Sequence, residues 1–220
     1  MSYTSTPRPV IENPHSDVVL VGTVPADSRQ QREVADAVVT HWQSRSWPAE
    51  LLSLTAYTSS DGESVLTYAQ WSSEEALRRS LEEGGTVSDL TGVTDSGVPA
   101  PVPYRLYRAV RGSAVADPAP VAGSFPVAFF GAENHRAARA WIDGLLAAEE
   151  ESEGEDRAYP GGISANMHIS LDGTSILSFS EWVTEAQAVA HIEAVWEPVL
   201  KELGGTGTLY RHFRSLFPER

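Results

Sequence analysis

The chain has 220 residues, of which 41% are hydrophobic, so it can bury a substantial core in one or two domains. Sixteen basic and thirty acidic residues give a net charge of −14, which makes nucleic acids and anionic membranes unfavourable partners. The absence of cysteine excludes disulfides, thiolate metal sites and cysteine nucleophiles. Residues 1–16 lack the pattern of a signal peptide, and no apolar run is long enough to cross a bilayer, so we expect a cytoplasmic protein.

The first predicted elements follow an N-terminal tail at residues 1–16. Residues 17–24 are apolar and β-branched, which predicts a strand. Residues 27–43 place apolar side chains at helical spacing, which predicts a helix. Residues 51–71 alternate in polarity on both sides of Asp61-Gly62, which predicts a β-hairpin closed by a two-residue turn.

A second helix and a closing strand complete this half of the chain. The helix is expected to start at Ser72, because Ser72 and Glu75 have the spacing of a capping box. Residues 103–110 predict the strand. The segment 112–123 is rich in small residues and proline, which predicts a linker.

The rest of the sequence repeats this pattern. The phrase "DGESVLTYAQW", which starts at Asp61, returns as "DGTSILSFSEW" from Asp172, an offset of 172 − 61 = 111 residues. The order of the predicted elements is the same on both sides of the linker. We therefore predict two homologous domains, residues 17–111 and 124–217.

Three further features are specific to the second half. Thr184 and Gln187 have the spacing of a capping box at the start of its second helix. The acidic run at 149–156 predicts a solvated loop between its first helix and second strand. Residues 207–214 predict its closing strand.

The order strand, helix, strand, strand, helix, strand is that of a ferredoxin-like βαββαβ domain, which has two helices on one face of an antiparallel sheet. The other face of the sheet would stay exposed in a single copy. We therefore predict an α+β fold in which two ferredoxin-like domains pack sheet to sheet, as an intramolecular version of a dimeric α+β barrel.

Hairpin geometry assigns side chains to the two faces of each predicted sheet, because partners across the turn share a face. The predicted pairs on one face of the second half are His168 with Leu177, Asn166 with Phe179 and Ser164 with Glu181. The corresponding residues of the first half are Ser53, Thr55, Tyr57, Leu66, Tyr68 and Gln70. We expect this more polar face to line the interior between the sheets and the other face to pack against the helices.

The polar cluster of His168, Asn166 and Glu181 is the strongest candidate for catalysis. A histidine of near-neutral pKa can take a phenolic proton, while Asn166 orients an oxygen and Glu181 holds a polar contact. The alternative is structural. In that case these groups hydrogen-bond across the interior to the tyrosines and Gln70 of the first half and fix how the sheets dock.

Aromatic residues are the candidates for substrate contact. The set consists of Trp182, Trp71, Tyr57, Tyr68 and Phe179. The two tryptophans end the third strand of each half on the helix-facing side, where the indole covers the core and its N–H is expected to find a backbone acceptor. The two tryptophans therefore either have a structural role or line a pocket. No histidines or carboxylates have the spacing of metal ligands, so no metal site is expected.

The strand-tryptophan-helix phrases "VLTYAQWSSEEAL" and "ILSFSEW" followed by Thr and Glu resemble the antibiotic biosynthesis monooxygenase superfamily, in two tandem copies. The resemblance implies oxidation of phenols or quinols by molecular oxygen in a dry pocket that supplies a base, without a metal or flavin. Several members use an asparagine four residues before the tryptophan, where this chain has Thr67 and Ser178. Haem-degrading relatives need an asparagine on the first strand, which is missing here, and an axial histidine later in the second helix than His191.

The predicted function is therefore that of a cofactor-independent monooxygenase that oxidises a small aromatic or polyketide-derived compound with molecular oxygen. Its partners would be the small-molecule substrate and oxygen, with no cofactor, no nucleic acid and no membrane. The two copies would form an intramolecular pseudo-dimer, and further association is left open. The alternatives are a non-catalytic small-molecule binding or stress-response protein of the same fold, and a protein that acts only through interactions.

Overall fold

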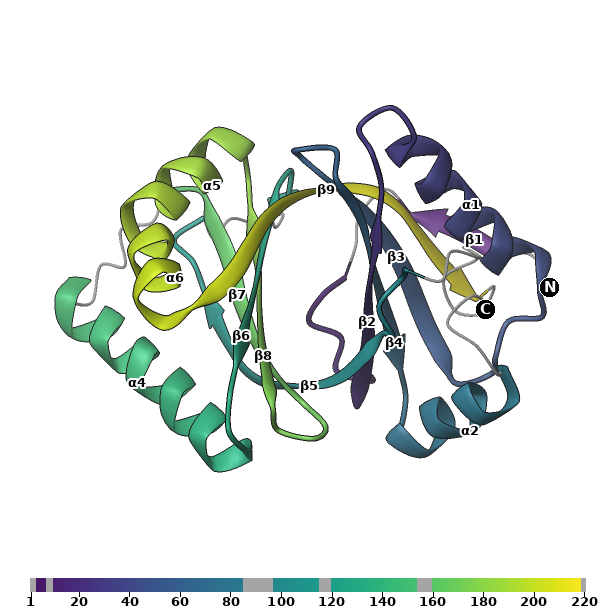
Figure 1. Cartoon of the computed structure of the whole chain (residues 1–220), viewed down its shortest axis with the longest axis horizontal. Coiled ribbons are helices and arrows are strands. Elements are labelled where there is room, and N and C mark those ends of the chain that lie inside the picture. The colour runs from purple at the N-terminus through teal and green to yellow at the C-terminus, as the bar shows by residue number, and fades with distance from the viewer. Residues whose placement is uncertain (1–2, 7–9, 85–96, 115–119, 154–159, 219–220) are drawn as a thin grey trace. The chain divides into compact units, whose positions relative to one another are not determined.

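We describe the protein from a computed structural model, which covers residues 3–6, 10–84, 97–114, 120–153 and 160–218 (Figure 1). The strands are β1 (Tyr3–Thr6), β2 (Val18–Pro25), β3 (Leu51–Ser59), β4 (Ser64–Trp71), β5 (Val102–Arg111), β6 (Phe125–Gly131), β7 (Gly162–Ser170), β8 (Ser175–Trp182) and β9 (Gly205–Pro218). The helices are α1 (Gln31–Ser44), α2 (Glu74–Gly84), α4 (His135–Glu153), α5 (Glu185–His191), the π-helical turn η1 (Ile192–Trp196) and α6 (Glu197–Leu203).

The chain divides into two compact units. Unit 1 consists of Met1–Tyr104 and Tyr210–Arg220, and unit 2 consists of Arg105–Leu209. The strands β5 and β9 each begin in one unit and end in the other. Each unit is described by itself below.

The predicted fold class is wrong, because the strands do not form two separate ferredoxin-like sheets that pack face to face. They form one sheet in the order β1-β9-β3-β4-β2-β5-β7-β8-β6, and an additional β9–β6 pairing closes the order on itself. Eight strands therefore follow one another in a closed cycle of pairings, with β1 paired outside it on β9. Closure leaves no unpaired edge among those eight strands.

The closing strands are what the sequence pattern misassigned. β5 pairs through Val102–Tyr104 with β2 of unit 1, and its later residues belong to unit 2, where the strand order places β7 beside it. β9 has 14 residues, and its second half pairs with β3. Side-chain alternation tells which face a residue occupies but not which strand lies beside it. A strand that changes partners along its length therefore has the same local pattern as one that stays in its own sheet.

In unit 1, α1 and α2 cover the same face of the sheet strands β2, β4 and β3 (Figure 1). The helix α1 buries its apolar stripe, which includes Val38 and Trp42 as predicted. A small cluster of Val24, Ala35 and Val65 joins this helix to the sheet. Ser53, Thr55 and Gln70 of the other face are hydrogen-bonded inside the unit. Gln70, for example, accepts a hydrogen bond from Ser53 at 2.6 Å and donates one to the Ile11 carbonyl at 2.9 Å.

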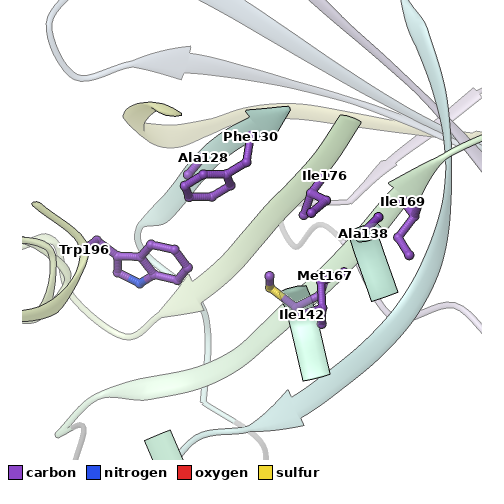
Figure 2. Packing of buried hydrophobic residues seen from close by; sticks show 8 residues of the cluster. All are labelled: Ala128, Phe130, Ala138, Ile142, Met167, Ile169, Ile176 and Trp196. Atoms are coloured by element: carbon purple, nitrogen blue, oxygen red, sulfur yellow. The ribbon is translucent and has the colours of Figure 1, made fainter. Parts of the chain in front are cut away.

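In unit 2, α4, α5 and α6 cover one face of β6, β8 and β7 (Figure 1). Figure 2 shows the core beneath them, which joins the sheet residues to α4 and η1. Its buried members are Ala128, Phe130, Ala138, Ile142, Met167, Ile169, Ile176 and Trp196. The placement of Met167, Ile169 and Ile176 in this core confirms the predicted helix-facing side of the hairpin.

The predicted hairpin register is confirmed in both units. β7 and β8 pair Ser164 with Glu181, Asn166 with Phe179 and His168 with Leu177. β3 and β4 pair Tyr57 with Leu66, Thr55 with Tyr68 and Ser53 with Gln70. Only glycine takes a positive φ in these turns, at Gly62 and Gly173, because a glycine lacks the Cβ that would clash there.

Two local predictions need correction. The cap of α2 is Ser73 rather than Ser72, since the Ser73 hydroxyl accepts the Ala76 N–H at 3.2 Å. The acidic run at 149–156 is not wholly a loop, because α4 continues through Glu153. Alanine and glutamate are strong helix formers, which outweighs the like charges along this stretch. Residues 85–96 and 154–159 lie outside the described residues, and the linker at 112–123 is described only in part.

No helix among the described segments is both long and apolar enough to span a membrane.

Replacing Gly173 with alanine is expected to destabilise the protein by about 1–3 kcal/mol, because φ at this residue is +77°. The new Cβ would also overlap the backbone nitrogen and the ring of His135 at the start of α4. Gly144→Ala is the matched control, since Gly144 lies inside α4 with nothing near its Cβ position. That replacement should stabilise by about 0.5–1 kcal/mol. Urea unfolding of both variants measures the difference, and equal effects of the two would contradict the expectation.

Candidate functional site

A cleft in unit 2 lies where the end of β5, the first residues of β7 and the segment from α5 to η1 meet. Its walls are mostly apolar, and its volume is about 50 Å³. Its lining residues are Val110, Arg111, Gly112, Gly162, Ser164, Ala165, Ser180, Trp182, His191 and Trp196. The cleft therefore combines aromatic rings with two hydroxyl groups and the cationic side chain of Arg111.

Trp182 and His191 form a ring pair in this cleft. Trp182 ends β8, and Thr184 then caps α5 by accepting the Gln187 N–H at 3.3 Å, which confirms the predicted cap. His191 is the last residue of α5, and its ring centroid lies 4.7 Å from that of Trp182 at an interplanar angle of 32°. The short connection from strand to helix thus holds both rings in one wall.

Trp196 reaches the same cleft through the π-helical turn η1. The Glu197 N–H donates to the Ile192 carbonyl, five residues back, where an α-helix would use the residue four back. Side chains five residues apart point about 140° apart around an α-helix, but a π turn brings them to nearly the same side. A proline at position 198 lacks the N–H that would continue the α-helical pattern. The π turn therefore places both His191 and Trp196 on the cleft.

The electrostatics of the cleft favour a neutral histidine. Burial disfavours the charged imidazolium and lowers the pKa of His191 from 6.5 to about 4. At neutral pH the ring is therefore uncharged, with one nitrogen able to accept a proton or a hydrogen bond. The guanidinium of Arg111, at the end of β5, supplies a positive charge to the same cleft.

The predicted catalytic residues are brought together in one hydrogen-bonded chain on the sheet face away from the helices. The Asn166 amide donates to the Ser164 hydroxyl at 2.9 Å, and that hydroxyl donates to the Glu181 carboxylate at 2.6 Å. His168 Nδ1 lies 3.0 Å from the backbone carbonyl of Asn166. Ser164 is also a residue of the cleft wall, but its hydroxyl is bonded on the face away from the helices, whereas Trp182 and His191 lie on the helix side.

His168 itself is fully buried and does not line the cleft. Burial lowers its pKa from 6.5 to about 4, and the hydrogen bonds to Asn166 and Leu177 oppose this only partly. The side-chain oxygen of Asn166 is buried without a hydrogen-bond partner among the described residues. A catalytic role for the three residues stays a prediction.

Of the predicted substrate contacts, Trp182 lines the cleft. Phe179 is fully buried beside Phe125, with 6.1 Å between ring centroids, and is not among the lining residues. Trp71, Tyr57 and Tyr68 belong to unit 1 and are buried there. The expectation that the Trp71 N–H meets a backbone acceptor is wrong, since this N–H has no partner among the described residues.

Sequence reasoning missed His191, Arg111, Ser164 and Trp196 as cleft residues. His191 follows the buried Ala188 by three residues, so helical periodicity places it on the side facing the sheet. That signal was available in the sequence. Arg111 and Trp196 had no such signal, because their positions depend on the partner change of β5 and on the π turn.

In the part of the chain that the structure describes, no group of three or more His, Asp or Glu side chains is arranged to hold a metal ion. The expectation that the protein works without a metal stays a prediction.

Comparisons with known proteins bear on the fold. No family model and no curated protein matches the chain. A solved structure of an anthrone oxidase-like protein matches with a TM-score of 0.68 and 14% sequence identity, over 94% of this chain and 95% of that one. A protein named as a candidate monooxygenase from Fusobacterium nucleatum matches with a TM-score of 0.57 and 9% identity, over 93% of this chain and 96% of that one.

A third structure, of a protein named as a candidate monooxygenase from Lactobacillus acidophilus, matches with a TM-score of 0.50 and 8% identity, over 90% of this chain and 94% of that one. Identities this low show a common fold and do not carry an activity across. The chain therefore shares its fold with these three proteins.

Proposed function

We propose that the cleft of unit 2 binds a small aromatic compound and that the protein oxidises this compound with molecular oxygen, without a cofactor. The observation that carries the proposal is the pair of Trp182 and His191, a ring face beside a neutral imidazole in an apolar cleft. An aromatic substrate would stack on the ring face and present its acidic proton to the imidazole. The names of the structural neighbours support the same class of reaction.

The chemistry requires a base and a dry site. In this proposal His191 takes a proton from a phenol or from the activated methylene of an anthrone-like compound, and Arg111 stabilises the resulting anion. The electron-rich anion then reacts with oxygen. For a methylene carbon, one oxygen atom becomes the carbonyl oxygen and the two hydrogens leave with the other oxygen as water, so no reductant is consumed.

The size of the cleft restricts the substrate. An apolar cavity that admits benzene measures about 150 Å³, whereas this cleft measures about 50 Å³. A ring therefore enters only when a wall moves. The wall side chains that are not buried are those of Arg111, which is exposed, and of the half-buried Val110, Ala165 and His191. We expect single-ring quinols to react faster than three-ring anthrones, because they require less opening.

A binding protein without turnover is the second candidate. It is favoured by the pKa of His191, because a base of pKa about 4 abstracts a proton weakly at neutral pH. In that case the ring pair would only hold or sense a ligand.

Anaerobic and aerobic incubation separates the two candidates. A panel of single-ring quinols and anthrones is incubated with the protein, and product is measured by chromatography together with oxygen consumption. The oxidation proposal expects product in air above the rate without protein and none under argon. Equal product under both conditions, or product equal to the protein-free rate, would remove it. Native mass spectrometry that finds a bound ring compound without turnover would support the binding candidate.

Several sequence-based expectations remain proposals alongside this function. These are the origin of the chain from two homologous copies with the bounds 17–111 and 124–217, its cytoplasmic location, and the catalytic action of His168, Asn166 and Glu181. Replacing His168 with alanine tests the last. Lost turnover with an intact fold supports catalysis, whereas lost stability with turnover retained supports a structural role.

A further inference from the structure

Unit 1 contains a cavity at the position that corresponds to the cleft of unit 2. Trp71 and Ser80 line it, and they precede Trp182 and His191 by the same offset of 111 residues (182 − 71 and 191 − 80). The cavity lies where the end of α1, the start of β3 and α2 meet, and its volume is about 310 Å³. It is therefore roomier than the cleft and lies in the size range of small-molecule sites.

The chemistry of this cavity differs from that of the cleft. Four charged side chains line it, namely Arg45, Glu50, Arg79 and Glu83. Arg79 and Glu50 form an ion pair whose hydrogen bond, at 3.5 Å, is long, so the two side chains are only weakly bonded to each other. The guanidinium of Arg45 is oriented by the ring of Trp42, 5.0 Å beneath it, and by a 3.3 Å contact with His41. Two cations and two anions thus surround one small volume.

We propose that this cavity binds a small zwitterion of the amino-acid type. The ligand carboxylate would lie against Arg45 and Arg79, and its ammonium group against Glu50 and Glu83. A simple anion would be repelled by the two glutamates and by the net charge of −14, and a simple cation by the two arginines. A molecule that carries both charges a few ångströms apart is complementary to both pairs.

Trp71 gives independent support for a ligand. Its side chain is 1% exposed and lines the cavity, and its indole N–H has no hydrogen-bond partner among the described residues. A buried donor left unbonded is costly, which makes such groups rare in folded proteins. The nitrogen is closed off from solvent in the ligand-free protein, so a small movement of the cavity wall is needed before a carboxylate oxygen or a water brought in with the ligand can accept from it. Nothing in this site depends on the proposed oxidation in unit 2.

Isothermal titration with matched ligands tests the proposal. L-leucine, L-glutamine and L-phenylalanine are each compared with their N-acetyl derivatives, which lack the positive charge, and their methyl esters, which lack the negative charge. We expect at least one free amino acid to bind saturably, and about tenfold or more tighter than either derivative, because each derivative loses a charge-assisted contact.

Variants of neighbouring arginines complete the test. Arg79→Gln should weaken binding of the free amino acid by about tenfold or more. Arg78→Gln is the control, since Arg78 lies on the same helix but pairs with Glu75 and Glu82 outside the cavity, and it should leave binding unchanged. The proposal is overturned if no amino acid binds at concentrations up to about 10 mM, if an N-acetyl derivative binds equally well, or if both variants lose affinity equally.

Discussion

His191→Phe is expected to lower kcat for the oxidation by about 100-fold or more, with little change in stability. Phenylalanine keeps a ring against Trp182, 4.7 Å away in the native pair, but it removes the nitrogen that accepts the proton. The fold should tolerate the change, because burial already favours an uncharged ring at this position. Turnover is measured by oxygen consumption, and binding by quenching of tryptophan fluorescence.

The control for this variant is His135→Gln, which changes an exposed histidine at the start of α4, away from the cleft. It should leave kcat and KM unchanged. If His191→Phe retains native turnover while His135→Gln does as well, the base lies elsewhere, and the buried cluster around His168 becomes the candidate to test. If the protein only binds its ligand, the His191 replacement changes the dissociation constant and there is no kcat to lose.

The faces and register of the hairpins were predictable from the sequence, whereas the partners of the closing strands were not. The pairs Asn166–Phe179 and His168–Leu177 follow from the two-residue side-chain period once the Asp-Gly turn sets the register. No such local rule decides whether a closing strand pairs within its own half of the chain or with a strand of the other half. The single closed sheet arises because β5 and β9 run on beyond the point where their first partner ends.

In the candidate site, too, some features could be predicted from the sequence and others could not. Trp182 was predicted because its place at the end of a strand can be read from the repeated phrase. Ser164 was placed on the correct face, opposite Glu181, but the hydrogen bond between the two side chains cannot be read from the sequence. Trp196 lines the cleft only because η1 departs from the α-helical period, and a period-based reading assumes that no such departure occurs. Where the backbone departs from regular helix geometry, sequence periodicity no longer tells on which side of the helix a residue lies.

Acidification is expected to destabilise the protein well before its carboxylates titrate, and His168 and His191 are expected to contribute the largest shares. The folded-state pKa of His168 is about 4, below the ordinary value of 6.5, because its ring is fully buried. As the pH falls from 6.5 to 4, the unfolded chain binds a proton at this residue and the folded chain does not. The contribution of His168 to the free energy of unfolding is therefore complete above pH 6.5. It is lost as the pH falls from 6.5 to 4, and no more is lost below pH 4.

The size of the effect follows from the shift. A displacement of about 2.5 pH units corresponds to about 3 kcal/mol between the two states. His191 and His212 have pKa values lowered by burial as well and add to the loss with the same sign. Asp61 and Asp172 also have lowered pKa values, but their stabilisation is lost only below the ordinary aspartate value of 3.8, outside the window. Acid sensitivity between pH 6.5 and 4 is therefore a property of the histidines.

His168→Gln isolates the contribution of that residue, because glutamine does not titrate and its amide can still donate to the Asn166 carbonyl. Urea unfolding of the native protein and the variant is measured at pH 7 and pH 4. The variant is expected to be less stable at pH 7, where its packing is imperfect, yet to lose about 3 kcal/mol less than the native protein on acidification. An equal loss in both proteins would mean that His168 is protonated in the folded state near its ordinary pKa. A buried, charged imidazole would then need a counter-charge, for which the carboxylate of Glu181, linked to Asn166 through Ser164, is the nearest candidate in the hydrogen-bonded chain.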